Sequence, residues 1–232
     1  MNKYVLIVAG GKGLRMGGDL PKQFIPMRGK SLLMHTLEAF HRWDASARII
    51  LVLPEDHQPY WNMLCKEIGC KVPHAIVKGG DTRFFSVKNG LDWLLAERRR
   101  KGEEDSGLSL VAVHDGVRPF VSPEVVEACF DKAAVTGAVI PVVPMIDSLR
   151  ETDEKGSHPV DRSRYMAVQT PQVFHLELLT KAYEQPYSSL FTDDASVVEA
   201  MGHAIDTVPG DRENIKISTP FDLLIAEAMF AR

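Results

Sequence analysis

The sequence has few cysteines and no long apolar run. Its cysteines are Cys65, Cys70 and Cys129, an odd number whose spacing matches no zinc-binding pattern. We therefore expect reduced, packed thiols and neither a disulfide framework nor a zinc site. No apolar run approaches the length of a membrane span, and the first is too short for a signal peptide. These absences predict a protein of the cytoplasm with no membrane partner.

The sequence also lacks an excess of positive charge. Its formal net charge is −4 at pH 7, whereas a broad nucleic-acid surface needs a basic excess, so we expect no nucleic-acid partner. The chain has 232 residues, of which 45% are hydrophobic and 25% charged. This length and composition fit one large α/β domain or two small ones, with a core that needs no disulfides.

Strand and helix patterns alternate along the chain. Short apolar runs predict buried strands at residues 4–8, 48–53, 75–77, 109–113, 138–143 and 204–208. Apolar spacing and capping residues predict helices at 31–43, 55–68, 86–99, 123–135, 176–183, 194–201 and 221–230. Such alternation predicts an α/β fold, in which helices cover both faces of a mostly parallel sheet. Ligands of these sheets bind at the carboxyl ends of the strands.

A glycine-rich loop follows the first predicted strand. Glycine lets backbone N–H groups approach a ligand closely, and nearby cations suit a polyphosphate. The loop is not a P-loop, because no register supplies a Gly-Lys-Ser/Thr ending, and a dinucleotide-binding turn would need a small residue where Met16 stands. We predict that the loop wraps a nucleoside triphosphate; the alternative is a turn with solvated charges. Its glycines and cations are Gly10, Gly11, Gly13, Gly17, Gly18, Lys12, Arg15 and Lys22.

Two more polar groups follow predicted strands. Asp81 and Ser86 come after the strand at 75–77 and suit contacts to a base or ribose, although both could instead cap a helix. Asp115 comes directly after the strand at 109–113. A carboxylate there is a candidate ligand for Mg²⁺, which often uses one or two carboxylates plus substrate phosphates. The alternative for Asp115 is a cap or an ion pair with Arg118.

Residues 145–166 break the alternation. The segment is polar and has a turn near 153–156. It is too long to be only a connecting loop in a compact domain. Two short strands around that turn would form a projecting hairpin, which cannot be stable alone. We therefore predict an arm that packs on a second copy of the chain in a homodimer.

Motifs spread over most of the chain resemble those of the polyol-phosphate cytidylyltransferases. The first is the glycine loop with Pro21-Lys22-Gln23, which resembles that of the sugar-nucleotide pyrophosphorylase-like nucleotidyltransferases. His114–Pro119 (HDGVRP) is similar to the HDAARP motif of the 2-C-methyl-D-erythritol 4-phosphate cytidylyltransferases. Gly116-Val117 departs from the usual Ala-Ala, and Ser148 stands where threonine is usual. The remaining motifs, in family order, are at 160–162, 169–172, 192–196 and 214–218.

The resemblance implies a single nucleotidyltransferase domain over 1–232, with a Rossmann-like fold and a dimerisation arm at about 145–166. It implies attack of a methylerythritol phosphate on the α-phosphorus of CTP, with release of pyrophosphate. Arg15, Lys22 and Lys216 would be catalytic, and Asp115 would hold Mg²⁺. The implied contacts to the polyol phosphate are Arg118, Ser148, Arg162 (reaching the neighbouring subunit) and Thr170. The implied contacts to CTP are Ala9, Gly10, Gly11, Lys12, Gly13, Asp81, Ser86 and Gly116.

Two alternatives remain open at this stage. A ribitol 5-phosphate cytidylyltransferase would share the glycine loop, the CTP contacts and the arm. A non-catalytic nucleotide-binding regulator could use the same fold. Arg15, Lys22, Asp115 and Lys216 together argue against the regulator, because binding alone does not require the cations of the reaction.

Overall fold

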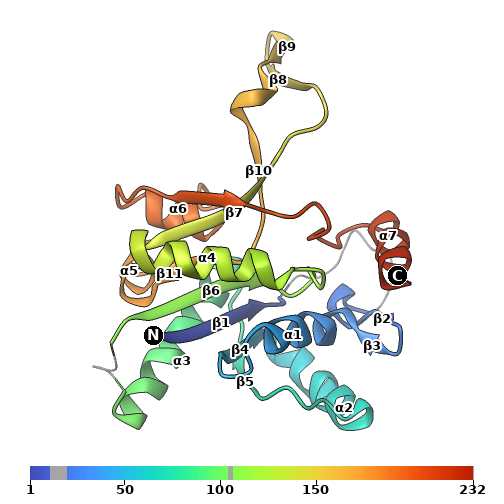
Figure 1. Cartoon of the computed structure of the whole chain (residues 1–232), viewed down its shortest axis with the longest axis vertical. Helices are drawn as coiled ribbons and strands as arrows, with labels where there is room; N and C mark the ends of the chain where they lie inside the picture. Colours follow the sequence, from blue (N-terminus) through green and yellow to red (C-terminus); the bar gives the residue numbers. More distant parts are fainter. Residues whose placement is uncertain (11–19, 104–106, 232) are drawn as a thin grey trace.

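The central sheet places four parallel strands side by side. In the computed structural model, which describes residues 1–10, 20–103 and 107–231, the sheet has eight strands among these residues. Its order is β10-β7-β11-β6-β1-β4-β5, with β12 also paired to β7 (Figure 1). The strands are β1 (Asn2–Val8), β4 (Arg48–Leu53), β5 (His74–Lys78), β6 (Ser109–Asp115), β7 (Ala138–Pro144), β10 (Met166–Val168), β11 (Gln172–His175) and β12 (Asp206–Pro209).

The register of these strands brings their carboxyl ends level. Val8 on β1 lies opposite Val52 on β4 and Asp115 on β6, and all three strands run parallel. Lys78 at the end of β5 lies opposite Leu53 at the end of β4. The segments after β1, β5 and β6 therefore meet at one edge of the sheet, as the alternating pattern predicts.

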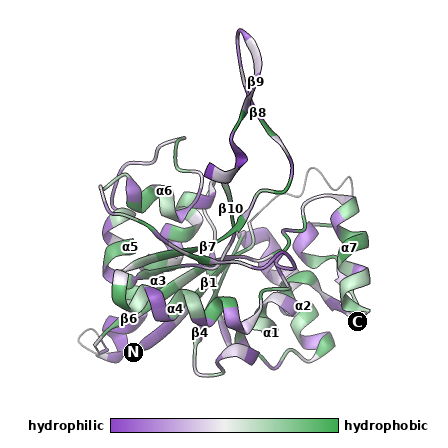
Figure 2. Ribbon diagram, turned by 45° about the horizontal axis from the view of Figure 1, so that its top comes forward, coloured by the Kyte–Doolittle hydropathy of each residue, from purple (hydrophilic) through white to green (hydrophobic). Residues whose placement is uncertain are grey.

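Helices cover both faces of the sheet. Val5 and Ile7 of β1 pack in one core with α1 (Leu32–Trp43), α2 (Gln58–Ile68) and α4 (Pro123–Thr136). Tyr4 and Leu6 point to the other face, which is covered by α3 (Arg83–Lys101), α5 (Leu176–Ala182) and α6 (Asp194–Glu199). Figure 2 shows the hydrophobic colour gathered on the strands between these helices. The α/β fold with a mostly parallel, helix-covered sheet is confirmed.

A smaller cluster lies beside the main sheet. The helix α7 (Pro220–Phe230) packs with the short hairpin of β2 (Pro26–Met27) and β3 (Lys30–Ser31) (Figure 1). Throughout the described part of the chain, no helix is both long and apolar enough to cross a bilayer.

The helix α3 differs from its prediction at both ends. It begins at Arg83 and not at Ser86, because the Thr82 side chain accepts a hydrogen bond from the backbone N–H of Phe85 at 3.3 Å and caps the helix. It continues through Arg98, Arg99 and Arg100 and ends at Lys101, beyond the predicted end at residue 99. Arg98, near the end of the helix, is buried: its guanidinium donates to the Ser109 hydroxyl and to a backbone carbonyl.

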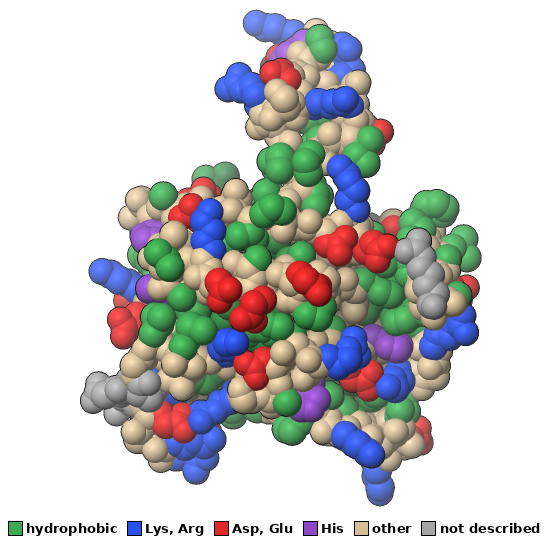
Figure 3. All heavy atoms as spheres, in the orientation of Figure 1, with side chains coloured by type: hydrophobic (Ala, Val, Ile, Leu, Met, Phe, Trp, Pro, Cys, Tyr) green, Lys and Arg blue, Asp and Glu red, His purple; other side chains and the backbone are tan. Residues whose placement is uncertain are grey.

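The polar segment forms the predicted hairpin. The strands β8 (Leu149–Asp153) and β9 (Gly156–Val160) pair antiparallel and project from the body as an arm (Figure 1). Figure 3 shows Lys and Arg side chains standing out from the end of this arm. A 3-10 turn, η4 (Arg162–Arg164), leads from the arm back to β10. The strands β10 and β11 were not predicted, and both run antiparallel to β7.

Candidate active site

A cavity of 220 Å³ opens at the carboxyl edge of the sheet. It is lined by the ends of β1 and β6, the turn before α3, and two segments that are distant in sequence. The predicted site residues Gly11, Lys12, Gly13 and Arg15 lie outside the described residues. The predicted site residues that line the cavity are Ala9, Gly10, Lys22, Asp81, Ser86, Asp115 and Lys216.

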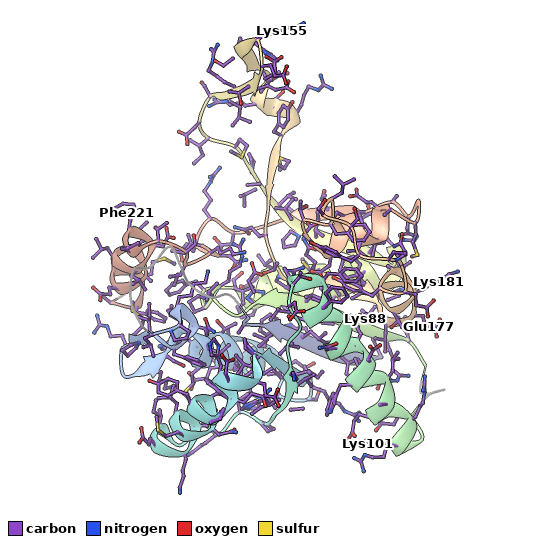
Figure 4. All side chains as sticks on the ribbon, turned by 180° about the vertical axis from the view of Figure 1, so that it is seen from behind. Lys88, Lys101, Lys155, Glu177, Lys181 and Phe221 are labelled. Atoms are coloured by element: carbon purple, nitrogen blue, oxygen red, sulfur yellow. The ribbon has the colours of Figure 1, made fainter. Side chains whose placement is uncertain are left out.

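A larger cavity of 810 Å³ lies at the opposite edge, where β6 begins and β11 ends. Its walls mix cations such as Lys181 with acids such as Glu177, both on α5 (Figure 4). None of the predicted site residues lines this cavity. The smaller cavity is therefore the better candidate for the site of chemistry.

Asp115 lies at the centre of a group of cations. Its carboxylate is 2.9 Å from the Lys216 ammonium, 3.4 Å from the Arg118 guanidinium and 3.8 Å from the Arg83 guanidinium. Burial alone would raise the pKa of the Asp115 carboxyl, but the charges of Lys216, Arg83 and Arg118 outweigh it and hold the pKa well below its ordinary value. Asp115 is consequently an ionised acceptor at neutral pH.

The donor set around Asp115 fits Mg²⁺ only if the substrates supply most of the ligands. Across residues 1–10, 20–103 and 107–231, no three His, Cys, Asp or Glu side chains are grouped to hold a metal ion. A single ionised carboxylate with room for phosphate oxygens and water matches the usual coordination of Mg²⁺. Asp115 is the residue that would hold the ion.

A buried hydrogen-bond chain fixes the end of β6. The backbone N–H of Asp115 donates to the Thr170 hydroxyl at 3.2 Å, and Thr170 in turn lies 3.0 Å from Nδ1 of His114. Nε2 of His114 is 3.0 Å from the backbone carbonyl of Arg118, which can only accept. Nε2 therefore carries the proton and Nδ1 accepts from Thr170. Thr170 thus sits behind Asp115, where it is buried and holds the end of β6 in place.

His114 should make the stability of the protein depend on pH. Burial lowers its pKa from 6.5 to about 4. Below pH 6.5 the unfolded chain binds a proton that the folded protein does not, so stability is complete above pH 6.5 and falls as the pH approaches 4. We expect about 2 kcal/mol less unfolding free energy from this group at pH 5 than at pH 7. Urea unfolding at both pH values measures the loss, and an NMR titration midpoint of His114 near 6.5 would contradict it.

Arg83 and Asp194 form an ion pair that sequence reasoning missed. Asp194 is fully buried, and the Arg83 guanidinium donates to its two oxygens at 2.9 and 2.6 Å. The Tyr183 hydroxyl donates to the same carboxylate at 2.6 Å. The pair fixes the guanidinium beside Asp115. The available signal was the motif at 192–196, which contains Asp194 but suggests no partner.

Gln23 belongs to the Pro21-Lys22-Gln23 motif, but the sequence analysis gave it no role. Its side-chain amide donates to the backbone carbonyl of Ala9 at 2.9 Å and lies 3.2 Å from Nδ1 of His57. The amide therefore ties η2 (Lys22–Phe24) to the end of β1. This contact sets the position from which Lys22 reaches the cavity.

Lys216 reaches the site because its segment is fastened to the loop after β6. The backbone N–H of Ile217 donates to the carbonyl of Val117 at 3.0 Å, and the Arg118 guanidinium donates to the carbonyl of Asn214 at 2.7 Å. The Asn214 amide donates to the carbonyl of Thr170 at 2.8 Å. Arg118 is thus engaged both with Asp115 and with the segment that carries Lys216.

Five of the predicted residues that the structure describes do not line the cavity, and two of them, Arg118 and Thr170, contact Asp115 from behind it. Gly116 packs against Ala9 and Leu33: an added Cβ would lie 2.8 Å from the Cβ of Ala9, so the position favours glycine for close packing. Ser148 is exposed at the base of the arm. Arg162 is also exposed, and its guanidinium donates to the carbonyl of Ile146. Within one chain, Ser148 and Arg162 stay apart from the site around Asp115.

The location and charges of the cavity indicate a class of chemistry. Cavities at the carboxyl edge of such sheets bind nucleotides, and fixed cations around an ionised carboxylate suit transfer at phosphorus. This arrangement suits a nucleotidyltransferase.

Comparison with known proteins narrows the class. Residues 4–232 match the family model of IspD, 2-C-methyl-D-erythritol 4-phosphate cytidylyltransferase, and the chain belongs to this family. It is 55% identical over 229 residues to the Bacteroides fragilis enzyme of that name, covering 99% of this chain and 100% of the relative. The Porphyromonas gingivalis enzyme is 51% identical over 98% of this chain and 97% of its own. The crystal structure of the Thermus thermophilus enzyme is 32% identical, with a TM-score of 0.74 and complete coverage of both chains.

Proposed function

We propose that this chain transfers the cytidylyl group of CTP to 2-C-methyl-D-erythritol 4-phosphate, in the non-mevalonate route to isoprenoids. The products are 4-diphosphocytidyl-2-C-methyl-D-erythritol and pyrophosphate. The observation that carries the proposal is the meeting of Lys22, Asp115 and Lys216 in one cavity, although they are far apart in the sequence. The full-length match to the IspD family supports it.

The reaction needs two anions to be held close together. An oxygen of the methylerythritol phosphate attacks the α-phosphorus of CTP, and the bond from that phosphorus to the bridging oxygen breaks as pyrophosphate leaves. The attacking phosphate is already an anion, so no strong general base is required. Lys22 and Lys216 supply fixed positive charge against the repulsion, which lowers the barrier without reorganisation. We assign the same role to Arg15.

Asp115 would hold the metal of the reaction. A bound Mg²⁺ neutralises phosphate charge and orients the triphosphate. Lys216 and Arg118 keep the Asp115 carboxylate ionised and in place.

We assign the nucleotide to the turn before α3 and to the end of β1. The Ser86 hydroxyl accepts from the backbone N–H of Gly80 at 3.1 Å and lies 2.9 Å from the carbonyl of Thr82, so it shapes this turn. A Cβ on Gly80 would lie 2.4 Å from that of Phe85, which explains the glycine. Asp81 is exposed beside the cavity and is our candidate for the base or ribose. Ala9 and Gly10 would contact the nucleotide, and Gly116 would keep the loop after β6 close to them.

We also propose one nucleotidyltransferase domain over 1–232, assembled as a homodimer through the arm at about 145–166. An isolated two-stranded hairpin is marginally stable, so the β8–β9 arm needs a surface to pack on. Large apolar side chains are exposed near its base, namely Ile146, Tyr165, Met166 and Val168. In the dimer, Arg162 and Ser148 would orient the polyol phosphate with Arg118 and Thr170, Arg162 acting in the partner's site. The three free cysteines agree with a reducing compartment such as the cytoplasm.

Mixed dimers test whether Arg162 acts across the subunits. We expect Arg162→Ala and Lys22→Ala homodimers each to lose most of their activity. A heterodimer of the two variants keeps one site with both wild-type residues, so some activity should return. Differently tagged chains allow verified heterodimers to be isolated before pyrophosphate release is measured. No recovery in those heterodimers would place Arg162 in its own subunit's site.

Pyrophosphate release tests the reaction itself. The protein is supplied with CTP and Mg²⁺ and with either methylerythritol 4-phosphate or ribitol 5-phosphate. We expect turnover with methylerythritol 4-phosphate as the acceptor and none with ribitol 5-phosphate. Turnover with ribitol 5-phosphate alone would replace the proposed acceptor and keep the CTP chemistry. Nucleotide binding without pyrophosphate release would instead favour a non-catalytic regulator.

A further inference from the structure

The end of α2 brings two cysteines together. Gly69 adopts the left-handed conformation (φ 69°) and ends the helix, and the backbone N–H of Cys70 donates to the carbonyl of Cys65 at 2.9 Å. This is the Schellman motif, in which the side chain just after the left-handed residue contacts the one three positions before the last helical residue. Cys65 and Cys70 occupy those two positions. Their proximity is therefore set by the backbone of the helix end.

The two thiols face each other and are partly accessible. The backbone of the helix end sets the two side chains beside each other, and both pack on the core beneath α1, α2 and α4 while staying only partly buried. The hydrogen bond from the Cys65 thiol lowers the pKa of Cys70, which favours the thiolate. Cys129 is fully buried, and burial raises its thiol pKa to about 12. The molecule therefore holds one partly accessible pair of thiols and one buried thiol.

Cys70 also lines a cavity of 410 Å³ that is separate from the nucleotide site. Its walls carry Lys30, Arg42 and Lys71 against the single acid Glu38. A small oxidant can reach the Cys70 sulfur from this cavity. The opposite end of α2 lies near Lys22, where Tyr60 and Trp61 contact the ring of Phe24.

We propose that Cys65 and Cys70 form a dithiol site that reduces hydroperoxides and closes into a disulfide. The Cys70 thiolate attacks the peroxide oxygen, the O–O bond breaks, and Cys70 becomes a sulfenic acid as the alcohol or water leaves. The Cys65 sulfur then attacks the Cys70 sulfur and the S–O bond breaks. Cys65 loses its proton, and the hydroxyl of the sulfenic acid leaves as water. Two thiols and one hydroperoxide thus give one disulfide, water, and an alcohol or a second water.

The position of Lys66 between the cysteines allows a direct test. Reduced full-length protein is treated with hydrogen peroxide, the remaining thiols are alkylated, and a non-reducing tryptic digest is analysed by mass spectrometry. Cleavage after Lys66 separates Cys65 from Cys70, so the disulfide should appear as peptide 49–66 linked to peptide 67–71. The intact chain should lose two hydrogen atoms, and dithiothreitol should restore them.

Variants separate the roles of the three cysteines. Cys129→Ala should form the linked peptides as fully as the wild type. Cys65→Ser should form none, and its Cys70 should be trapped as a sulfenic acid by a 1,3-diketone probe. The proposal is overturned if Cys65 and Cys70 stay alkylatable after peroxide, or if disulfides form only between chains or with Cys129. It is also overturned if Cys70→Ser, and not Cys65→Ser, retains the sulfenic acid.

Discussion

Replacing Lys22 by alanine is expected to lower kcat by roughly a hundred- to a thousand-fold while the thermal midpoint stays unchanged. Lys22 lines the same cavity as Asp115 and Lys216, where the proposed reaction would develop charge on the phosphate oxygens. We expect the fold to survive the loss of this ammonium, because the neighbouring Gln23 and Phe24 hold η2 in place through Ala9, His57 and Trp61. Only contacts that are stronger in the transition state raise kcat, so the KM for CTP should change much less.

For Lys22→Ala, steady-state pyrophosphate release measures kcat, and a thermal melt measures the unfolding midpoint. The matched control is Lys88→Ala, since Lys88 lies on α3 and pairs with Asp92 at 3.8 Å outside the cavity (Figure 4). The control should keep wild-type turnover. Near-wild-type turnover of Lys22→Ala would remove Lys22 from the catalytic residues, and a lowered melting temperature would show that the residue supports the fold.

Replacing Asp194 by alanine is expected to cost about 3 kcal/mol of unfolding free energy. Asp194 is fully buried and accepts hydrogen bonds from Arg83 and Tyr183. Without it, a guanidinium and a hydroxyl lose their partner inside the protein. The side chain of Arg83 is 31% exposed, so water offsets part of the loss and the lower end of the usual range applies. Urea unfolding with linear extrapolation measures the change.

A double variant distinguishes loss of the pair from loss of packing. Arg83→Met with Asp194→Leu removes both charges, and we expect it to recover most of the stability, because apolar pairs often replace buried ion pairs at little cost. Its activity should stay low, since Arg83 also lies near Asp115. The surface control Glu199→Ala, on the same helix α6, should change stability by less than about 0.5 kcal/mol. A double variant as unstable as Asp194→Ala would contradict the ion-pair explanation.

The sequence predicted the parts of the fold that rest on local patterns. The apolar run RIILVL at 48–53 forms β4. Five of its six residues are buried, as expected for a strand that is covered on both faces of the sheet. The N-cap Ser31 started α1 as expected, with its hydroxyl accepting from the backbone N–H of Met34. The polar segment formed the hairpin, with β8 and β9 on either side of the expected turn and their side chains mostly exposed.

The sequence could not predict β11, because distant contacts create it. Gln172–His175 has only two apolar residues in a row, too few to indicate a strand. Its Gln172 is buried because the side chain donates to the Asp193 carboxylate at 2.8 Å and accepts from the backbone N–H of Ala195 at 3.0 Å. These partners come from α6 and its N-cap, so no local pattern contains them.

The candidate site also has residues that a local pattern predicts and residues that only distant contacts bring together. Asp115 was predictable as a carboxylate directly after an apolar strand. Nothing local links it to Lys216 or Arg83, and Lys216 was assigned only through the family resemblance. The Arg83–Asp194 pair joins residues 111 positions apart. Ion pairs between residues that are far apart in the sequence produce no local pattern from which they could be predicted.

The hydrogen bonds that fasten Lys216 to the loop after β6 have a consequence for synthesis on the ribosome. A nascent chain that has emerged only as far as α6 already contains seven of the eight strands of the sheet. It still lacks Asn214 and Lys216, so Arg118 and Asp115 have not met their last partners. The nucleotide cavity is thus completed only in the final stretch of translation. A partial chain can build most of its core before it exposes a finished active site.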